Sequence, residues 1–181
     1  CKRIKSKTIN MNLFDQSVYS RKLLENVISK TPLEKNEYYS KINNANIYFK
    51  REDLQIGRSY KVRGAYSKIT QLSEQEKEIG IVCASAGNHA QGVSIACSMI
   101  GIKGVVFMPL TTPKQKIKKV HDFGGENIKI KLIGDSFDET KQIALDYSNK
   151  YKKIFIHPFD DEKVIAGQGS VGLEIKDQIN K

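Results

Sequence analysis

Two short segments contain the residues whose types and spacing are best suited to catalysis. The first, residues 59–65, reads Ser-Tyr-Lys-Val-Arg-Gly-Ala and sets Lys61 between Tyr60 and Val62. The second, residues 85–92, begins 24 residues after Lys61 and reads Ser-Ala-Gly-Asn-His-Ala-Gln-Gly. A lysine amine becomes a useful nucleophile when it is desolvated or placed at the positive end of a helix. Alone, Lys61 is most simply interpreted as a solvated surface charge, so its assignment depends on the second segment.

The second segment is predicted to be a turn from a buried strand into a helix. Backbone N–H groups at such a helix start lack partners and bind a carboxylate or phosphate. Ser85 adds a hydroxyl donor, Gly87 permits close backbone approach, and Asn88 carries both donors and an acceptor, which suits a phenolate oxygen. An ordinary N-cap at Ser85 or Asn88 is the alternative interpretation. A lysine that forms a Schiff base opposite an anion-binding loop indicates pyridoxal phosphate chemistry.

Strand and helix patterns alternate along the middle of the chain. Short apolar runs predict strands at 81–84, 105–108, 128–133 and 154–156. Between them, helices are predicted over 88–100, from a Thr112 N-cap with Pro113 at the first helical position, and from a capping box at Ser136 to about 151. Upstream, helices are expected over 17–30 and 61–71 and a strand over 47–49. This order predicts an α/β fold with a parallel sheet flanked by helices, whose ligands bind at the carboxyl ends of the strands.

Composition excludes several classes of protein. The 181 residues carry a net charge of +10, but 25 of the 30 basic residues are lysines spread along the chain, so no nucleic-acid partner is expected. Cys83 and Cys97 lie in apolar stretches without metal-ligand spacing, which predicts reduced core cysteines and no metal site. No apolar run is long enough for a membrane span, and no signal core follows the basic first ten residues. A cytoplasmic location is expected, with organellar targeting left open.

The order and length of the motifs resemble the threonine dehydratase (threonine ammonia-lyase) family of fold-type II pyridoxal phosphate enzymes. Beside the two segments above, the resemblance includes Lys-Arg-Glu-Asp-Leu-Gln at 50–55, Val-Phe-Met-Pro at 106–109, His-Pro-Phe-Asp-Asp at 157–161 and Ile-Ala-Gly-Gln-Gly at 165–169. It runs from about residue 17 to the end and implies a tryptophan synthase β-like fold. It also implies a homo-oligomer when the protein has its full length.

The resemblance implies a role for each matched residue. Lys61 would bind pyridoxal 5'-phosphate covalently and then take the α-proton of the substrate. Tyr60 would lie against the cofactor ring, where the family often has Phe, and Asn88 would bond the ring oxygen. The substrate carboxylate would be held by Ser85, Gly87, Asn88 and the following amide of His89. The implied reaction converts L-threonine, and L-serine with it, to a keto acid and ammonia; threonine gives 2-oxobutanoate, for isoleucine biosynthesis or threonine catabolism.

Alternatives on the same fold stay open. Serine racemases place a second serine at the position of Ala86, so Ala86 favours elimination over racemisation, while Val62 and His89 argue against a cysteine synthase. A serine/threonine racemase, a serine dehydratase, an inactive remnant and a basic binding domain remain. Gly167-x-Gly169-x-x-Gly172 matches the dinucleotide fingerprint, but no strand directly precedes it, so a helix start or a packing requirement is the better explanation.

The family's domain division predicts three parts. Residues 1–53 would contribute to a large domain, 54–150 would form a small α/β domain, and 151–181 would return to the large one. No glycine-rich phosphate loop is visible before Lys181. The chain is therefore expected to be the N-terminal part of the catalytic region, truncated after the small domain. Such a segment is expected to bind the cofactor poorly and to be inactive alone.

Overall fold

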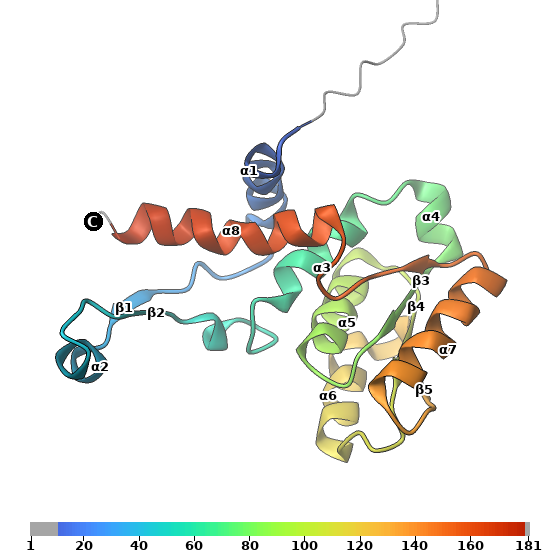
Figure 1. The fold of residues 1–181 in the computed structure, drawn as a ribbon. Coiled ribbons are helices and arrows are strands. Elements are labelled where there is room, and N and C mark those ends of the chain that lie inside the picture. Colours follow the sequence, from blue (N-terminus) through green and yellow to red (C-terminus); the bar gives the residue numbers. More distant parts are fainter. Residues whose placement is uncertain (1–10, 180–181) are drawn as a thin grey trace, which may run out of the picture.

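A four-stranded parallel sheet organises the centre of the computed structural model, which describes residues 11–179. The strand order is β5 (Ile128–Leu132), β4 (Gly104–Met108), β3 (Ile81–Ala84) and β6 (Ile154–Phe155), and every neighbouring pair is parallel (Figure 1). All residues of β3 and β4 are buried, as expected for central strands covered on both faces. The predicted α/β class and the positions of the four strands are confirmed, with ends that differ by one residue.

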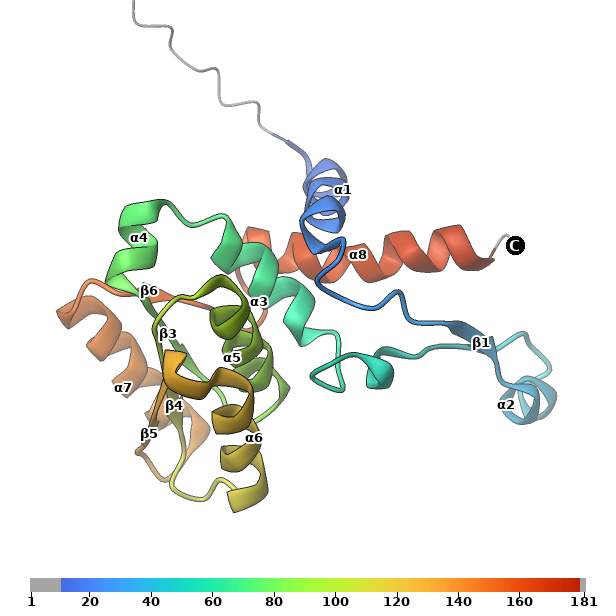
Figure 2. The same cartoon turned by 180° about the vertical axis from the view of Figure 1, so that it is seen from behind.

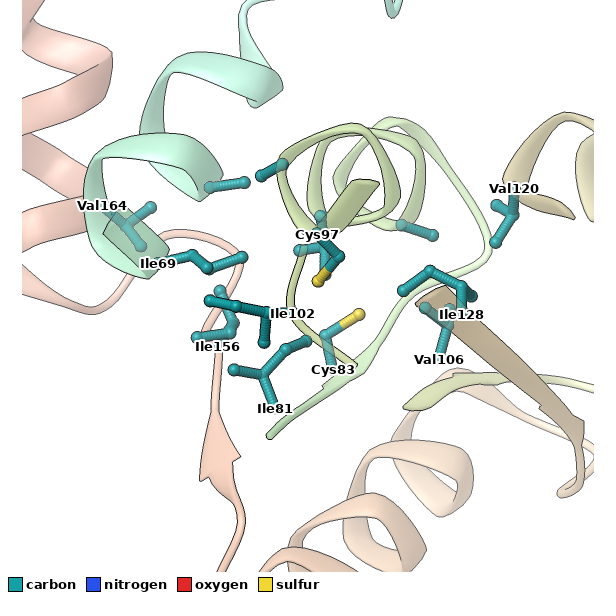
Figure 3. Packing of buried hydrophobic residues seen from close by; sticks show 14 of the residues in the cluster. Ile69, Ile81, Cys83, Cys97, Ile102, Val106, Val120, Ile128, Ile156 and Val164 are labelled. Atoms are coloured by element: carbon teal, nitrogen blue, oxygen red, sulfur yellow. The ribbon is translucent and has the colours of Figure 1, made fainter. Parts of the chain in front are cut away.

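Helices cover both faces of this sheet. On one face lie α5 (Asn88–Ile100) and α6 (Lys114–Gly124), followed by the short η2 (Gly125–Asn127), and on the other lies α7 (Phe137–Lys150) (Figures 1 and 2). The α5 side holds the larger apolar cluster, in which Cys83 and Cys97 are fully buried free thiols (Figure 3). The prediction that these cysteines belong to the core is confirmed.

A second group of elements packs beside α5. It comprises α1 (Leu13–Leu24), α3 (Lys61–Thr70) and the long α8 (Glu162–Ile179), while α4 (Glu74–Ile79) connects α3 to β3. Near the far end of α8, β1 (Leu33–Lys35) and β2 (Tyr48–Lys50) form an antiparallel hairpin that carries α2 (Glu37–Ile42), and the short η1 (Glu52–Leu54) leads back toward α3 (Figure 1).

Two helix starts differ from their predictions. The first helix begins at Leu13 because the side chain of Asn12 caps it, accepting from Asp15 N–H at 3.0 Å, and it ends at Leu24 rather than near residue 30. Thr112 does not cap α6: the extended ψ of 136° at Pro113 makes Pro113 the N-cap, so the helix begins one residue later. The Thr112 hydroxyl is buried without a partner among the described residues.

The capping box predicted at Ser136 forms only in part. The Ser136 hydroxyl accepts from Glu139 N–H at 3.2 Å, but the Glu139 carboxylate accepts from Asp135 N–H instead of from Ser136. The helix starts at Phe137 all the same. Within residues 11–179, no helix combines the length and apolar character needed to cross a bilayer, and no group of His, Cys, Asp and Glu is arranged to hold a metal ion.

Candidate active site

Lys61 is the first residue of α3, where the helix abuts the start of α5. The contact is close because Gly92 has no side chain: a Cβ there would lie 2.9 Å from both Lys61 C and Val62 N. Gly92 is little more than one turn after Asn88, the first residue of α5. The fold therefore brings together the two segments that the sequence separates, and it does so through a backbone contact that only glycine allows.

The Lys61 amine is half-buried and directed to the end of β6. Its Nζ donates a hydrogen bond to Pro158 O at 2.9 Å and lies 5.2 Å from the centroid of the Tyr60 ring. The Tyr60 side chain is 43% exposed, so its ring lines an open side of the lysine. An amine held in this way is oriented by the fold and still accessible to a small molecule.

The loop at 85–88 lies at the carboxyl end of β3, as predicted. Ser85 extends the sheet, donating its N–H to Phe107 O at 3.0 Å, and its hydroxyl accepts from Gly87 N–H at 3.1 Å. Gly87 is the N-cap of α5 and provides no side-chain cap, so neither Ser85 nor Asn88 is the ordinary N-cap that was the alternative. Asn88 is exposed, and a Cβ on Gly87 would meet nothing within 4 Å. The helix start is therefore open to an anion.

His89 follows Asn88 but its side chain turns away from the loop into the core. It is 3% exposed, and its Nε2 lies 3.0 Å from Ile156 O. A carbonyl can only accept, so Nε2 carries the proton and Nδ1 keeps a lone pair, for which the described residues offer no partner. Burial lowers the pKa of His89 to about 4, and the nearby charge of Lys61 acts in the same direction. The imidazole is therefore neutral at physiological pH.

A buried ion network next to Lys61 has no counterpart in the sequence-based expectations. The Arg63 guanidinium is fully buried and binds Glu52 through Nε and Nη2, at 2.8 and 2.7 Å, and Glu174 through Nη1 at 2.7 Å. Lys50 Nζ adds a second cation at 2.5 Å from Glu174. Burial would raise the pKa of Glu174, but hydrogen bonds from Arg63 and Lys50 outweigh it and hold that pKa below its ordinary value. The network ties β2, η1 and α8 to α3, two residues along the chain from Lys61.

The glycines of the apparent dinucleotide fingerprint lie within α8. A Cβ on Gly167 would lie 2.6 Å from Arg63 O and 2.7 Å from Gly64 Cα, so α3 and α8 cross in contact at this point. Gly169 faces the Ser17 side chain of α1, whereas Gly172 has open space around it. The packing explanation is confirmed for Gly167 and Gly169 and does not account for Gly172.

These observations test whether the site fits pyridoxal phosphate. The cofactor needs a primary amine for its aldehyde, donors for its ring oxygen, and space over the ring face. The Lys61 amine, the open start of α5 with Asn88, and the exposed Tyr60 ring supply these three requirements. The residues present fit the cofactor, while the roles assigned to Tyr60, Lys61, Ser85, Gly87, Asn88 and His89 remain predictions.

Comparison with known proteins agrees with a site for pyridoxal phosphate. The chain is 53% identical over 159 residues to the biosynthetic L-threonine dehydratase IlvA of Lactococcus lactis, covering 88% of this chain and 38% of that protein. It is 50% identical over 157 residues to the IlvA protein of Bacillus subtilis, covering 87% of this chain and 37% of that protein. The chain thus spans less than two fifths of the length of these relatives.

Solved structures share the fold. The processed threonine deaminase isoform 2 of Solanum lycopersicum superposes with a TM-score of 0.83 at 41% identity, covering 91% of this chain and 48% of that one. Maize serine racemase superposes with a TM-score of 0.84 at 26% identity, covering 93% and 50%. A family model described as "Pyridoxal-phosphate dependent enzyme" matches residues 24–181. With a parallel sheet flanked by helices and a lysine at the mouth of an open helix start, the chain belongs to the pyridoxal-phosphate dependent enzymes of tryptophan synthase β-like fold.

Proposed function

We propose that this chain is part of an enzyme that deaminates L-threonine, and L-serine with it, by β-elimination, giving 2-oxobutanoate and ammonia from threonine. The observation that carries the proposal is the backbone contact between Lys61, the first residue of α3, and Gly92 in the second turn of α5, beside the open start of that helix. The Lys61 amine is held by Pro158 O at 2.9 Å. The named activity of relatives at about 50% identity supports this reaction among those that occur on the fold.

The residues around Lys61 divide into cofactor and substrate groups. Lys61 would hold the pyridoxal phosphate, Tyr60 would lie against its ring, and Asn88 would bond its ring oxygen. When bound, the cofactor supplies an electron sink for the negative charge that develops at the substrate Cα. Half-burial of Lys61 among the packed starts of α3 and α5 fixes the direction from which its amine reaches that carbon.

The start of α5 is the proposed site of the substrate carboxylate. The Ser85 hydroxyl and the backbone N–H groups of Gly87, Asn88 and His89 are the proposed donors, and the helix dipole favours a negative charge. Gly87 N–H donates to the Ser85 hydroxyl at 3.1 Å in the structure and would turn to the carboxylate when it binds. Because the His89 side chain is directed to Ile156, its backbone N–H is the group that this residue offers. With the carboxylate held, the Lys61 amine would take the α-proton and return it to the β-hydroxyl, which leaves as water. The enamine that results takes up one water and gives the keto acid and ammonia.

Ala86 favours elimination over racemisation. It follows Ser85 in the loop and carries only a methyl group, which cannot deliver a proton to the opposite face of Cα. Racemisation needs an acid on that face, whereas both proton transfers of the elimination can take place on the Lys61 side. The serine racemases among the structural neighbours are 26% and 30% identical to this chain, against 41% for the threonine deaminase isoform 2.

Several coarser features belong to the same proposal. We propose that residues 1–53 and 151–181 serve a large domain and that 54–150 form the small one. We also propose a cytoplasmic homo-oligomer that has no nucleic-acid partner. The relatives are more than twice as long as this chain, which leaves room for a phosphate-binding loop in their remaining parts. Activity is therefore a property of the full-length protein.

The experiment is an assay of the full-length protein with L-threonine and L-serine, recording keto-acid release and the configuration at Cα of the remaining substrate. The proposal expects keto acid to appear while the substrate stays in the L form, and Lys61→Ala to abolish release. Racemisation faster than keto-acid release would replace the proposal with the racemase alternative. Absence of both reactions in a folded, cofactor-loaded protein would refute it.

A further inference from the structure

The turn that follows β6 receives the Lys61 amine, although it lies 97 residues further along the chain. Pro158 O accepts from Lys61 Nζ at 2.9 Å, and two residues earlier Ile156 O bonds His89 Nε2 at 3.0 Å. Side chains from the start of α3 and from the start of α5 thus both hydrogen-bond to the backbone of residues 156–158. Its geometry decides where the Lys61 amine lies.

A single side chain closes this turn. His157 Nδ1 accepts from Asp160 N–H at 2.8 Å and more weakly from Phe159 N–H at 3.4 Å. The ring also packs edge-on against Phe159, with centroids 4.7 Å apart and planes at 85°, and lies 6.2 Å from the Phe155 ring. The imidazole therefore spans the turn around Pro158 and orients its carbonyl.

The far end of the turn is fixed to the same helix. Asp161 pairs with Lys68 at 2.6 Å, and its other oxygen caps α8 by accepting from Val164 N–H at 3.1 Å. Lys61 and Lys68 are seven residues apart, so they project from the same face of α3. The turn is thus held to α3 at two points, Pro158 by Lys61 and Asp161 by Lys68. The conformation between these points depends on the hydrogen bonds of His157.

The state of the ring suits this task. An Nδ1 that accepts two N–H groups must be unprotonated, which leaves the proton on Nε2. Burial lowers the pKa of His157, the charge of Lys141 acts in the same direction, and Asp160 and Asp161 oppose it. The ring is therefore in its accepting form at neutral pH.

We propose that His157 is a positioning residue, which closes the 157–161 turn so that the Pro158 carbonyl holds the Lys61 amine whenever that amine is not bonded to the cofactor. This inference rests on the proposed role of Lys61 as the cofactor-binding lysine. The Pro158 carbonyl gives the Lys61 amine one defined position while it is not bonded to the cofactor.

Two substitutions separate the acceptor from the ring. His157→Phe keeps an aromatic ring against Phe155 and Phe159 but has no acceptor. His157→Asn loses the ring and keeps an oxygen near the position of Nδ1, in the geometry of an Asx-turn. A purely structural role in ring packing predicts that Asn is the more damaging change, whereas a positioning role predicts that Phe is.

The readout is the access of the Lys61 amine in the cofactor-free, full-length protein. Trace acetylation followed by peptide mass spectrometry gives the labelling rate of Lys61 relative to the exposed Lys114 of α6, a reference far from the turn in sequence. In His157→Phe we expect this ratio to rise about tenfold, the weight of one charge-assisted hydrogen bond. In His157→Asn we expect it to stay within about twofold of the unsubstituted protein, since the acceptor is kept.

The inference would be overturned if the labelling ratio of Lys61 to Lys114 were equal in the unsubstituted protein, His157→Phe and His157→Asn. It would also be overturned if this ratio rose more in His157→Asn than in His157→Phe. If thermal melting shows that His157→Phe does not fold, His157→Asn against His157→Ala poses the same comparison, since both lack the ring and only one has an acceptor. The measurement needs neither cofactor nor threonine. An enzyme that fails to deaminate threonine would therefore refute the proposed function without changing these ratios.

Discussion

Gly92→Ala should disturb the site through a single methyl group. The added Cβ would lie 2.9 Å from Lys61 C and Val62 N and 3.0 Å from Lys61 O. All three are backbone atoms, so no side chain can rotate away, and α3 and α5 must separate. Ordinary contact begins at 3.4 Å, and the shortfall of 3.4 − 2.9 = 0.5 Å is the least shift required. Lys61 lies at the contact and moves with it.

The expected cost combines two opposing effects. Overpacking in a close contact costs about 1–3 kcal/mol, and replacing a helical glycine with alanine returns about 1 kcal/mol through propensity. We expect Gly92→Ala to lower the free energy of unfolding by up to about 2 kcal/mol. A shift of half an ångström at Lys61 should also slow covalent attachment of the cofactor by about tenfold, since a 1 Å misplacement of a reacting group costs about a hundredfold in rate.

Gly172→Ala is the matched control. It makes the same substitution in a helix, but a Cβ there meets nothing within 4 Å, so only the propensity gain of about 0.5–1 kcal/mol remains. Urea denaturation and the rate of pyridoxal phosphate attachment, followed by absorbance, compare the two variants in the full-length protein. The reasoning is refuted if Gly92→Ala is as stable as Gly172→Ala and attaches the cofactor equally fast.

Two further predictions concern buried groups. Arg63→Met should lower the free energy of unfolding by about 3–5 kcal/mol, because it leaves Glu52 and Glu174 buried without their guanidinium; a urea midpoint equal to that of the unsubstituted protein would contradict this. His89 has a native pKa of about 4 against an ordinary 6.5, so the unfolded chain binds the extra proton between these values and stability rises with pH across that window. The gain should reach about 3 kcal/mol. The difference between unsubstituted protein and His89→Gln, measured by urea denaturation from pH 4 to 7, should show it; parallel profiles would argue against the assignment.

Local patterns were sufficient to predict the elements that carry the loop. The strand β3 is a short apolar run. The helix α5, which begins at Asn88, ends at Gly101, whose φ is 79°. Both signals lie within a few residues of the feature they determine. The position of the 85–88 loop at the carboxyl end of a parallel strand followed from the strand–helix alternation alone.

The long-range interactions of Arg63 and His89 could not be predicted from local patterns. Arg63 meets Glu174 from 111 residues away, and the His89 ring finds Ile156 O at a separation of 67 residues. In the sequence, Arg63 reads as an ordinary charge in a helix, because burial and partners are set by the crossing of α3 and α8. Thr112 shows the local counterpart: its pattern matched an N-cap, but the extended backbone at Pro113 made the cap residue the proline.

The measurement that tests the central claim most directly is the site of covalent cofactor attachment. The full-length protein is loaded with pyridoxal phosphate, reduced with borohydride, digested and mapped by mass spectrometry. The account predicts a phosphopyridoxyl group on Lys61 and no such group in Lys61→Ala, although the chain offers 24 other lysines. Attachment at another lysine, or undiminished attachment in Lys61→Ala, would contradict it.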